Sequence, residues 1–284
     1  LFLCLTSAKI PKMKILDPLH EKSFRENGYF IIENFFSTNQ IEELYTYYKS
    51  WGFQENPELT SSIKRSSYED SSKISNHLNS YFSGALNRYF QEYQIGSGVF
   101  IMKGSGESSV SSLHQDCNVV DERKYVSVTI WCPLIDVDEQ NGCLQVIPGS
   151  HKWFSVIRSF NTPSYFVDFE LVAERLRALP MKKGSVAVFS HSLIHGSKPN
   201  YSNTYRPVAS FSLTSANAKP IHYILNKNKF QVCIADEDFF FNKSPKLFAG
   251  ETDIGVTIID EFECKDEHLF TKDLVLKALK ENPL

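Results

Sequence analysis

The sequence predicts a mainly β protein with flanking helices, in which a helical N-terminal part packs against a β-barrel or sandwich core. Apolar residues before residue 95 recur at helical spacing, whereas residues 98–216 contain short β-branched and aromatic runs separated by turn residues. The 22 Phe and 13 Tyr residues also suit β-rich structure. Because no repeat or low-complexity linker divides the 284 residues, one domain is the simpler organisation.

The first hundred residues contain one early strand and two amphipathic helices. Residues 28–36 (GYFIIENFF) predict the strand. Ser37 and Gln40 stand in capping-box spacing and predict a helix over 37–51. A second helix is predicted over 71–93, with one apolar face: Ile74, Leu78, Phe82, Leu86 and Tyr89. Both aromatic stripes are typical of core packing rather than of a cofactor site.

The strands of the β core are predicted from five apolar runs: 98–103, 124–134, 142–149, 184–197 and 205–216. The Asn-Gly pair in EQNGC (139–143) predicts a hairpin-type turn. Residues 166–179 (FVDFELVAERLRAL) predict a helical insertion, and Thr271 is the expected cap of a closing helix within 268–281.

Composition argues against several classes of protein. The formal net charge is −3 and no basic block is present, so the sequence has no footprint for nucleic acid or for a large CoA-binding patch. The six cysteines never form C-x-x-C, which argues against a zinc ribbon or a thioredoxin site. They suit reduced core residues, so a cytoplasmic location is expected. A small-molecule substrate is the expected partner.

The apolar start, LFLCLTSA, resembles the end of a secretory signal. It has neither an initiator Met nor a basic region, and it is too short to span a membrane. Residues 1–12 are therefore interpreted as a non-native or disordered leader, with secretion as the alternative. The predicted organisation is a single domain over 13–284, made of helical support over about 13–95, a β core over about 96–215 and a C-terminal extension over 216–284.

A histidine and a carboxylate indicate where the chemistry lies. On a strand, side chains at i and i+2 project from one face, so His114 and Asp116 are expected to point together into the barrel. They need a third metal ligand from another strand. Of the eight histidines, His191 and His195 are predicted to lie four apart on one strand face. His195, at a Gly-Ser turn, is the better ligand. His191 is interpreted as a supporting or packing residue, and it is the alternative ligand because it too would face inward. The other histidines lie outside the predicted strands: His20, His77, His151, His222 and His268.

Two histidines and one carboxylate form the facial triad of non-haem iron(II) oxygenases, which leaves coordination positions open. A bidentate 2-oxo acid can take two of them and dioxygen the third. An oxo acid with a distal carboxylate also needs a cationic anchor. The turn GSKPNYSNTY is expected to return Arg206 on the strand beside His195, where a guanidinium can hold a carboxylate through two parallel hydrogen bonds.

With these motifs in place, the sequence resembles the phytanoyl-CoA dioxygenase family of iron(II)/2-oxoglutarate oxygenases. The matching stretches are LHQD, NGCLQVIPGSHK, GSVAVFSHSLIHGSKPNYS and YRPVASF, with weaker similarity in FRENGYFIIENFFS, so that the resemblance covers most of residues 22–215. It implies a double-stranded β-helix (jelly-roll, cupin-like) core that binds Fe(II), 2-oxoglutarate and O2, with ascorbate as an accessory reductant. The implied reaction is hydroxylation of an unactivated C–H bond of a small organic substrate, with release of succinate and CO2.

The resemblance also assigns roles to residues. It places His114, Asp116 and His195 on the iron. Arg206 is the implied anchor of the 2-oxoglutarate carboxylate. The residues implied beside that anchor are Ser197, Trp131 as a pocket wall, and Lys103 as an assisting cation. Gln115 is expected to point away from the site. Because halogenating relatives lack the carboxylate, Asp116 favours hydroxylation over halogenation.

Two other functions compete with this interpretation. One is a cupin-like metalloenzyme that does not use 2-oxoglutarate, and the other is a non-catalytic jelly-roll binding module. Arg206 and the His-Gly-Ser turn argue against both. The N-terminal helices, residues 152–180 and the tail after 215 are candidates for a lid over the substrate. Three aromatic residues are candidates for the lining of the substrate pocket, although a packing role is favoured for each: Phe100, Tyr165 and Phe166.

Overall fold

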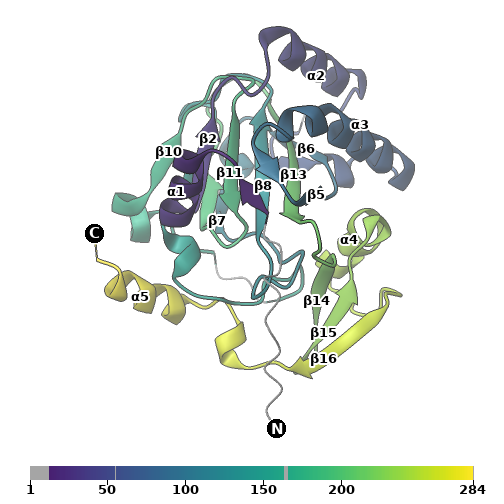
Figure 1. Ribbon diagram of the computed structural model, residues 1–284, viewed down its shortest axis with the longest axis vertical. Coiled ribbons are helices and arrows are strands. Elements are labelled where there is room, and N and C mark those ends of the chain that lie inside the picture. Colours follow the sequence, from purple (N-terminus) through teal and green to yellow (C-terminus); the bar gives the residue numbers. More distant parts are fainter. Residues whose placement is uncertain (1–12, 55, 163–165, 284) are drawn as a thin grey trace.

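The computed structural model describes residues 13–54, 56–162 and 166–283, and two antiparallel sheets form its centre (Figure 1). The larger sheet has seven strands in the order β2-β11-β8-β13-β6-β3, with β5 beside β13. These strands are β2 (Tyr29–Ile32), β3 (Leu59–Ser61), β5 (Tyr93–Ile95), β6 (Val99–Lys103), β8 (Ser127–Pro133), β11 (Val186–Ser190) and β13 (Arg206–Ser215). The smaller sheet has the order β10-β9-β12-β7, with β7 (Ser111–His114), β9 (Leu144–Val146), β10 (Arg177–Leu179) and β12 (His195–Ser197).

Strand β8 shows how the two faces of the larger sheet are used. Trp131 points toward the smaller sheet and packs in a buried cluster with Leu144 and Val146 of β9. Its neighbours Ile130 and Cys132 belong to a cluster on the opposite face. Successive side chains of a strand point to opposite faces, so one face of β8 meets the smaller sheet and the other meets the helices.

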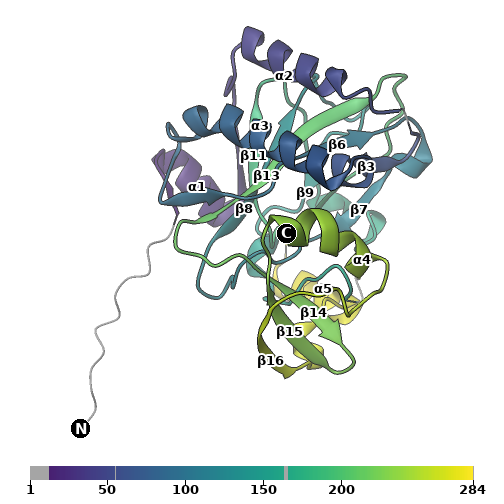
Figure 2. The same cartoon turned by 90° about the vertical axis from the view of Figure 1, so that its right-hand side faces the viewer.

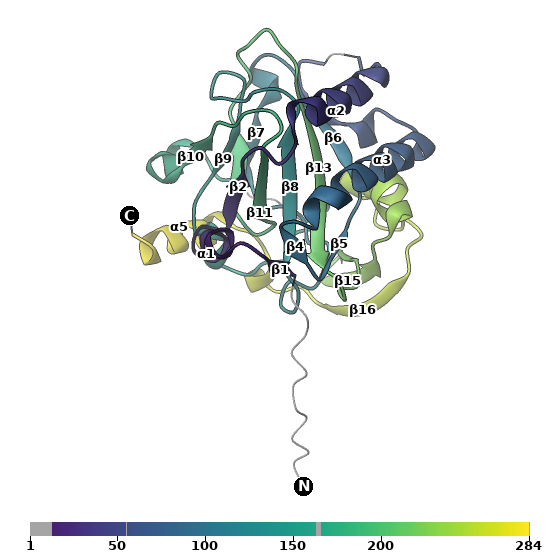
Figure 3. The same cartoon turned by 45° about the horizontal axis from the view of Figure 1, so that its top comes forward.

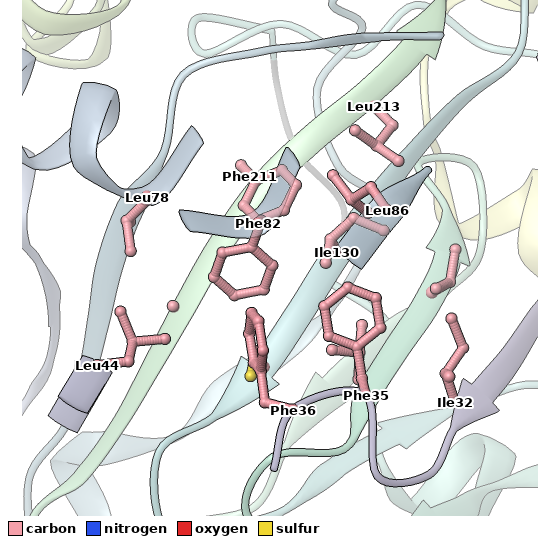
Figure 4. Close-up of a cluster of buried hydrophobic side chains, with 14 of the residues drawn as sticks. Ile32, Phe35, Phe36, Leu44, Leu78, Phe82, Leu86, Ile130, Phe211 and Leu213 are labelled. Carbon is pink, nitrogen blue, oxygen red and sulfur yellow. The ribbon is translucent and has the colours of Figure 1, made fainter. Parts of the chain in front are cut away.

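Helices α2 (Thr38–Ser50) and α3 (Tyr68–Leu86) pack on this second face of the larger sheet, and α1 (Pro18–Asn27) precedes β2 (Figure 3). Phe82 of α3 meets Phe211 of β13 edge-on, with ring centroids 4.8 Å apart (Figure 4). The aromatic stripes predicted from the sequence are therefore core residues, and they position the sheet rather than a ligand.

The predicted bounds are confirmed for α2 but not for α3. The capping box is present, because the Ser37 hydroxyl accepts a hydrogen bond from the Gln40 backbone and the Gln40 side chain accepts one from the Ser37 backbone. The second helix begins three residues earlier than predicted, at Tyr68, because the Ser67 side chain caps it. It ends at Leu86, so that Tyr89 lies beyond the helix.

All five runs predicted as strands contain strands, but the run 184–197 is divided between two sheets. Its first part is β11 in the larger sheet and its last part is β12 in the smaller sheet. The predicted helical insertion over 166–179 was wrong at both ends. Only Glu170–Arg175 is helical, as a 3-10 helix. Val167 forms an isolated β-bridge with Leu113, and Arg177–Leu179 pairs with β9 as strand β10. Two short strands, β1 (Lys14–Ile15) and β4 (Phe90–Gln91), pair with each other.

The residues after β13 form a third sheet, of three strands, and two α-helices beside the core (Figure 2). The elements are β14 (Ile221–Asn226), β15 (Lys229–Ile234), α4 (Ser244–Phe248), β16 (Ile258–Glu263) and α5 (Lys272–Glu281). His222 was predicted to lie outside the strands, which was wrong, because it lies in β14. Four successive residues of β14 are buried, so its sequence lacks the alternation that indicates a strand.

The closing helix α5 is capped by Thr271 as predicted. Val275 of α5 and Phe270 pack against Leu113 of β7 and Ile194. No helix within the described ranges combines the length and the hydropathy needed to cross a bilayer. The whole is a mixed α/β fold with several antiparallel sheets, so the predicted β core with flanking helices is confirmed, although helices form more of the chain than a mainly β fold implies.

Candidate metal centre

Three side chains from two strands and one loop converge at the end of the smaller sheet. His114 is the last residue of β7 and His195 the first residue of β12, and the two lie directly opposite each other in the pairing of these strands. Their ring centroids are 4.5 Å apart. Oδ1 of Asp116 lies 3.8 Å from Nε2 of His114 and 3.6 Å from Nε2 of His195. Within the described residues, these three form a group whose ligand atoms all lie within 4.8 Å of one another.

The remaining polar atoms of the three side chains are already hydrogen-bonded. Nδ1 of His114 donates to the Ser112 carbonyl at 2.7 Å, and Nδ1 of His195 donates to the Leu193 carbonyl at 2.9 Å. These bonds select the tautomer whose Nε2 carries the free lone pair. Oδ2 of Asp116 accepts from the Thr129 hydroxyl at 2.6 Å, which leaves Oδ1 free. Two imidazole nitrogens and one carboxylate oxygen therefore fit an iron(II) ion with open positions.

The protonation states of Asp116 and His195 also suit a metal. Burial raises the pKa of Asp116, but His195, His191, His114 and the Thr129 hydrogen bond outweigh it and hold that pKa at about 2. Burial lowers the pKa of His195 to about 4, although Asp116 acts in the opposite direction. At neutral pH Asp116 is ionised and His195 is neutral, which are the forms that bind a metal.

The route of the chain through this centre differs from the prediction in two ways. Strand β7 ends at His114, so Asp116 lies in the following loop rather than on the strand. His191 and His195 were predicted to share one strand face, which was wrong. Strand β11 ends at Ser190, and His191 lies in the turn that carries the chain to β12 in the other sheet. His191 is buried and accepts a hydrogen bond from the Asp116 backbone N–H at 2.9 Å through its carbonyl.

Arg206 begins β13 in the larger sheet, so its predicted place on the strand beside His195 was wrong. It lies opposite Lys103 in the pairing of β13 with β6. Its side chain is buried, with the residue only 2 % exposed, and the guanidinium carbon lies 5.1 Å from the centroid of the Trp131 ring. Nε is buried without a hydrogen-bond partner. Burial lowers the pKa of Arg206 to about 10, so the group stays charged at neutral pH. A buried, charged guanidinium with an unused donor is suited to bind an anion.

The other residues predicted near this anchor are also buried. Ser197 lies on β12 opposite Ser111. Nζ of Lys103 donates to the carbonyls of Ser109 and Lys198, the latter at 2.8 Å. Burial, with a smaller effect from Arg206, lowers the pKa of Lys103 to about 7.

The turn predicted from Asn-Gly lies against this lysine. Gly142 has a φ of +73°, and a Cβ there would lie 2.7 Å from the Lys198 carbonyl oxygen and 2.9 Å from Cδ of Lys103. Only glycine accommodates both the conformation and the close approach without strain.

The remaining sequence predictions have mixed outcomes. The Gln115 amide donates to the Ser192 carbonyl, which agrees with a structural role. Phe100 is fully buried beside Tyr48, which confirms packing. Phe166 is 54 % exposed, so it is not a packed core residue. Tyr165 lies outside the described residues.

Two neighbours of Asp116 escaped the sequence interpretation. Thr129 could have been found, because it lies two residues before Trp131 on the same face of β8. Arg158 donates from Nε to the Asp116 carbonyl at 2.6 Å, across 42 residues of sequence, and no local pattern marks it.

Comparisons with known proteins agree with this geometry. The family profile of phytanoyl-CoA dioxygenase (PhyH) matches residues 24–208. Peroxisomal phytanoyl-CoA dioxygenase of Bos taurus is 26% identical over 245 residues, covering 74% of this chain and 71% of the relative. The Homo sapiens protein is 25% identical over 281 residues, covering 86% and 80%.

Solved structures share the fold. The epimerase SnoN in complex with Fe3+, alpha ketoglutarate and nogalamycin RO has a TM-score of 0.52 at 15% identity, covering 72% of this chain and 87% of that one. EvdO2 from Micromonospora carbonacea var. aurantiaca has a TM-score of 0.51 at 18% identity, covering 72% and 94%. The profile match confirms the family resemblance predicted from the sequence.

Proposed function

Because the chain belongs to the phytanoyl-CoA dioxygenase family of 2-oxoglutarate-dependent non-haem iron oxygenases, we propose that it hydroxylates an unactivated C–H bond of a small organic substrate, releasing succinate and CO2. The observation that carries the proposal is the convergence of Nε2 of His114, Nε2 of His195 and Oδ1 of Asp116, each with its other polar atom already bonded. In this proposal the two central sheets are the double-stranded β-helix, and residues 13–284 form one cytoplasmic oxygenase domain.

His114, Asp116 and His195 would hold the iron. When bound with 2-oxoglutarate and dioxygen, iron would supply the oxidising power for oxidation of a C–H bond, and ascorbate would keep the metal in the iron(II) form. The chain's own task is to hold the ligands in place and to exclude water from the reacting centre. Two imidazoles and one carboxylate would leave coordination positions of the ion for cosubstrate and oxygen.

Arg206 would bind the distal carboxylate of 2-oxoglutarate. Its unpaired Nε and its burial against Trp131 support this role. A buried guanidinium without a counter-anion costs free energy, and the carboxylate of 2-oxoglutarate would supply that anion. Ser197 would add a hydroxyl donor and Trp131 a wall. Lys103 already donates to two backbone carbonyls. With its pKa lowered to about 7, it would add part of a positive charge at neutral pH. The same unpaired cation argues against a cupin-like enzyme without 2-oxoglutarate, which would have no use for it.

The proposal is tested by mixing the protein with Fe(II) and 2-oxoglutarate without oxygen and recording the visible charge-transfer band of the complex. We expect a band in the wild type, its loss in His114→Ala and its weakening in Arg206→Ala. His77→Gln is the matched control, because His77 is a half-buried histidine on α3 that stacks on Tyr47, away from the candidate ligands. A folded, iron-loaded wild type without a band would refute the proposal. If the band is present, candidate substrates can be identified by the release of succinate.

A further inference from the structure

A buried ion pair lies directly behind the Asp116 ligand. Arg158 is only 5 % exposed, and its Nη2 donates to both carboxylate oxygens of Glu122 at 2.6 Å. Its Nε donates to the Asp116 carbonyl at 2.6 Å, and its Nη1 donates to the Val156 carbonyl at 3.1 Å. The guanidinium thus ties the loop that carries Asp116 and Glu122 to the segment of Val156, and one of its contacts is the backbone of a candidate metal ligand.

Asp116 needs such a support because no strand holds it. It follows the end of β7, in a loop whose backbone lacks a ladder partner. Its N–H donates to the His191 carbonyl at 2.9 Å, and its C=O accepts from Arg158 at 2.6 Å. These two groups flank the Asp116 Cα, so the pair of bonds determines the backbone torsions there and with them the direction of the carboxylate.

A further set of contacts ties Arg158 to the same loop and to the C-terminal extension. The Arg158 N–H donates to Oδ1 of Asn118 at 2.8 Å, and the Asn118 N–H donates to the Arg158 carbonyl at 3.0 Å. Nδ1 of His222 in β14 donates to the Asn118 carbonyl at 3.0 Å. The Ser127 hydroxyl donates to Glu122 at 3.1 Å. The arginine is therefore held from several sides, and it has little freedom to release Asp116.

We propose that Arg158, oriented by Glu122, is a positioning residue that presents the Asp116 carboxylate to the metal. The inference rests on the proposed function. The guanidinium acts through the Asp116 backbone and does not touch the metal ligands' donor atoms. Arginine is required because its planar fork reaches a carbonyl on one edge and a carboxylate on another, whereas the ammonium group of lysine cannot span both. A buried ion pair of this kind is weak evidence for a role in stability alone.

The test measures metal binding rather than turnover. Wild type, Arg158→Gln, Arg158→Lys and Arg123→Gln are titrated with Co(II) alone, and both the affinity and the visible absorption of the bound ion are recorded. Arg123 is the matched control, because it pairs with Asp121 through two bonds of 2.8 and 3.0 Å in the same loop but is exposed. We expect Co(II) binding about 10- to 100-fold weaker in both Arg158 variants, with a changed spectrum, and within about twofold of wild type in the control.

Each outcome decides the inference. Thermal unfolding without metal shows which variants are folded. If Arg158→Gln does not fold, the comparison uses Arg158→Lys, which keeps the charge. A folded Arg158 variant with wild-type affinity and spectrum would overturn the inference while the proposed function stands. Equal weakening in Arg123→Gln would also overturn it, because the loop as a whole would then be responsible. A wild type that binds no Co(II) would instead remove the proposed function, and the inference with it.

Discussion

Replacing Arg206 with Met should make the protein more stable without 2-oxoglutarate and unable to gain stability from it. The guanidinium is buried, lies opposite Lys103 and has an unpaired Nε. Burial lowers its pKa to about 10, which corresponds to a penalty of about 3 kcal/mol for holding the charge in this place. The contact with Trp131 at 5.1 Å returns about 0.5–2 kcal/mol. We therefore expect the free energy of unfolding to rise by about 1–2 kcal/mol in Arg206→Met.

The assay is urea unfolding at pH 7, with and without 2-oxoglutarate and a redox-inert divalent metal. Wild type should gain about 2.7 kcal/mol at a ligand concentration one hundred times the dissociation constant. Arg206→Met should gain no measurable stability from 2-oxoglutarate at the same concentration. Arg123→Met serves as the control, because it removes an exposed guanidinium and should leave both quantities near the wild-type values.

Two results would refute this reasoning. If Arg206→Met were less stable than wild type by more than about 1 kcal/mol in the absence of ligand, the guanidinium would already be satisfied within the protein, as buried pairs are. If 2-oxoglutarate stabilised the variant as much as the wild type, its carboxylate would be anchored elsewhere.

Three further predictions concern the surroundings of the site. Thr129→Val removes the 2.6 Å hydrogen bond to Asp116 and should weaken Co(II) binding about tenfold. Thr129→Ser retains this hydrogen bond and should bind Co(II) like the wild type. Equal binding by the wild type and both variants would exclude a role of the hydrogen bond in metal binding. Burial lowers the pKa of His222 to about 4, so on acidification the unfolded chain binds this proton before the folded protein does. The free energy of unfolding should therefore fall as the pH drops from about 6.5 to 4, by up to about 1.4 kcal/mol per pH unit. Urea unfolding should show a weaker dependence on pH in His222→Phe, and an unchanged dependence would contradict the prediction. Gly142→Ala introduces strain at a φ of +73° and should destabilise the protein by about 1–3 kcal/mol in thermal unfolding. Gly84→Ala lies within α3, where a Cβ meets no atom within 4 Å, and should stabilise the protein by about 0.5–1 kcal/mol. Equal effects of the two substitutions would show that neither the available space nor φ determines the cost at Gly142.

Features that depend on neighbouring residues could be predicted from the sequence. The capping box of Ser37 and Gln40 is such a feature, because a helix start is decided within four residues. The core stripe of α3 is another, since helical spacing alone aligns Leu78 with Phe82. The family resemblance followed in the same way, from the residue types and spacings of short motifs.

Features that depend on distant partners could not. The division of residues 184–197 between two sheets separates His191 from His195, and only the pairing of each strand with its neighbours decides it. The strand β10 replaced part of a predicted helix because β9 was there to pair with it. Strand β14 carried no alternation, because it is buried on both faces.

The candidate site divides along the same line. Residue types in short motifs predicted the two imidazoles, the carboxylate and the guanidinium. Their arrangement depends on strand pairing, because β7 and β12 place His114 opposite His195 and Arg206 comes from the larger sheet rather than from the strand beside His195. The physical reason is that hydrogen-bond ladders and burial join residues far apart in the chain. The contact of Arg158 with Asp116 across 42 positions has no local trace.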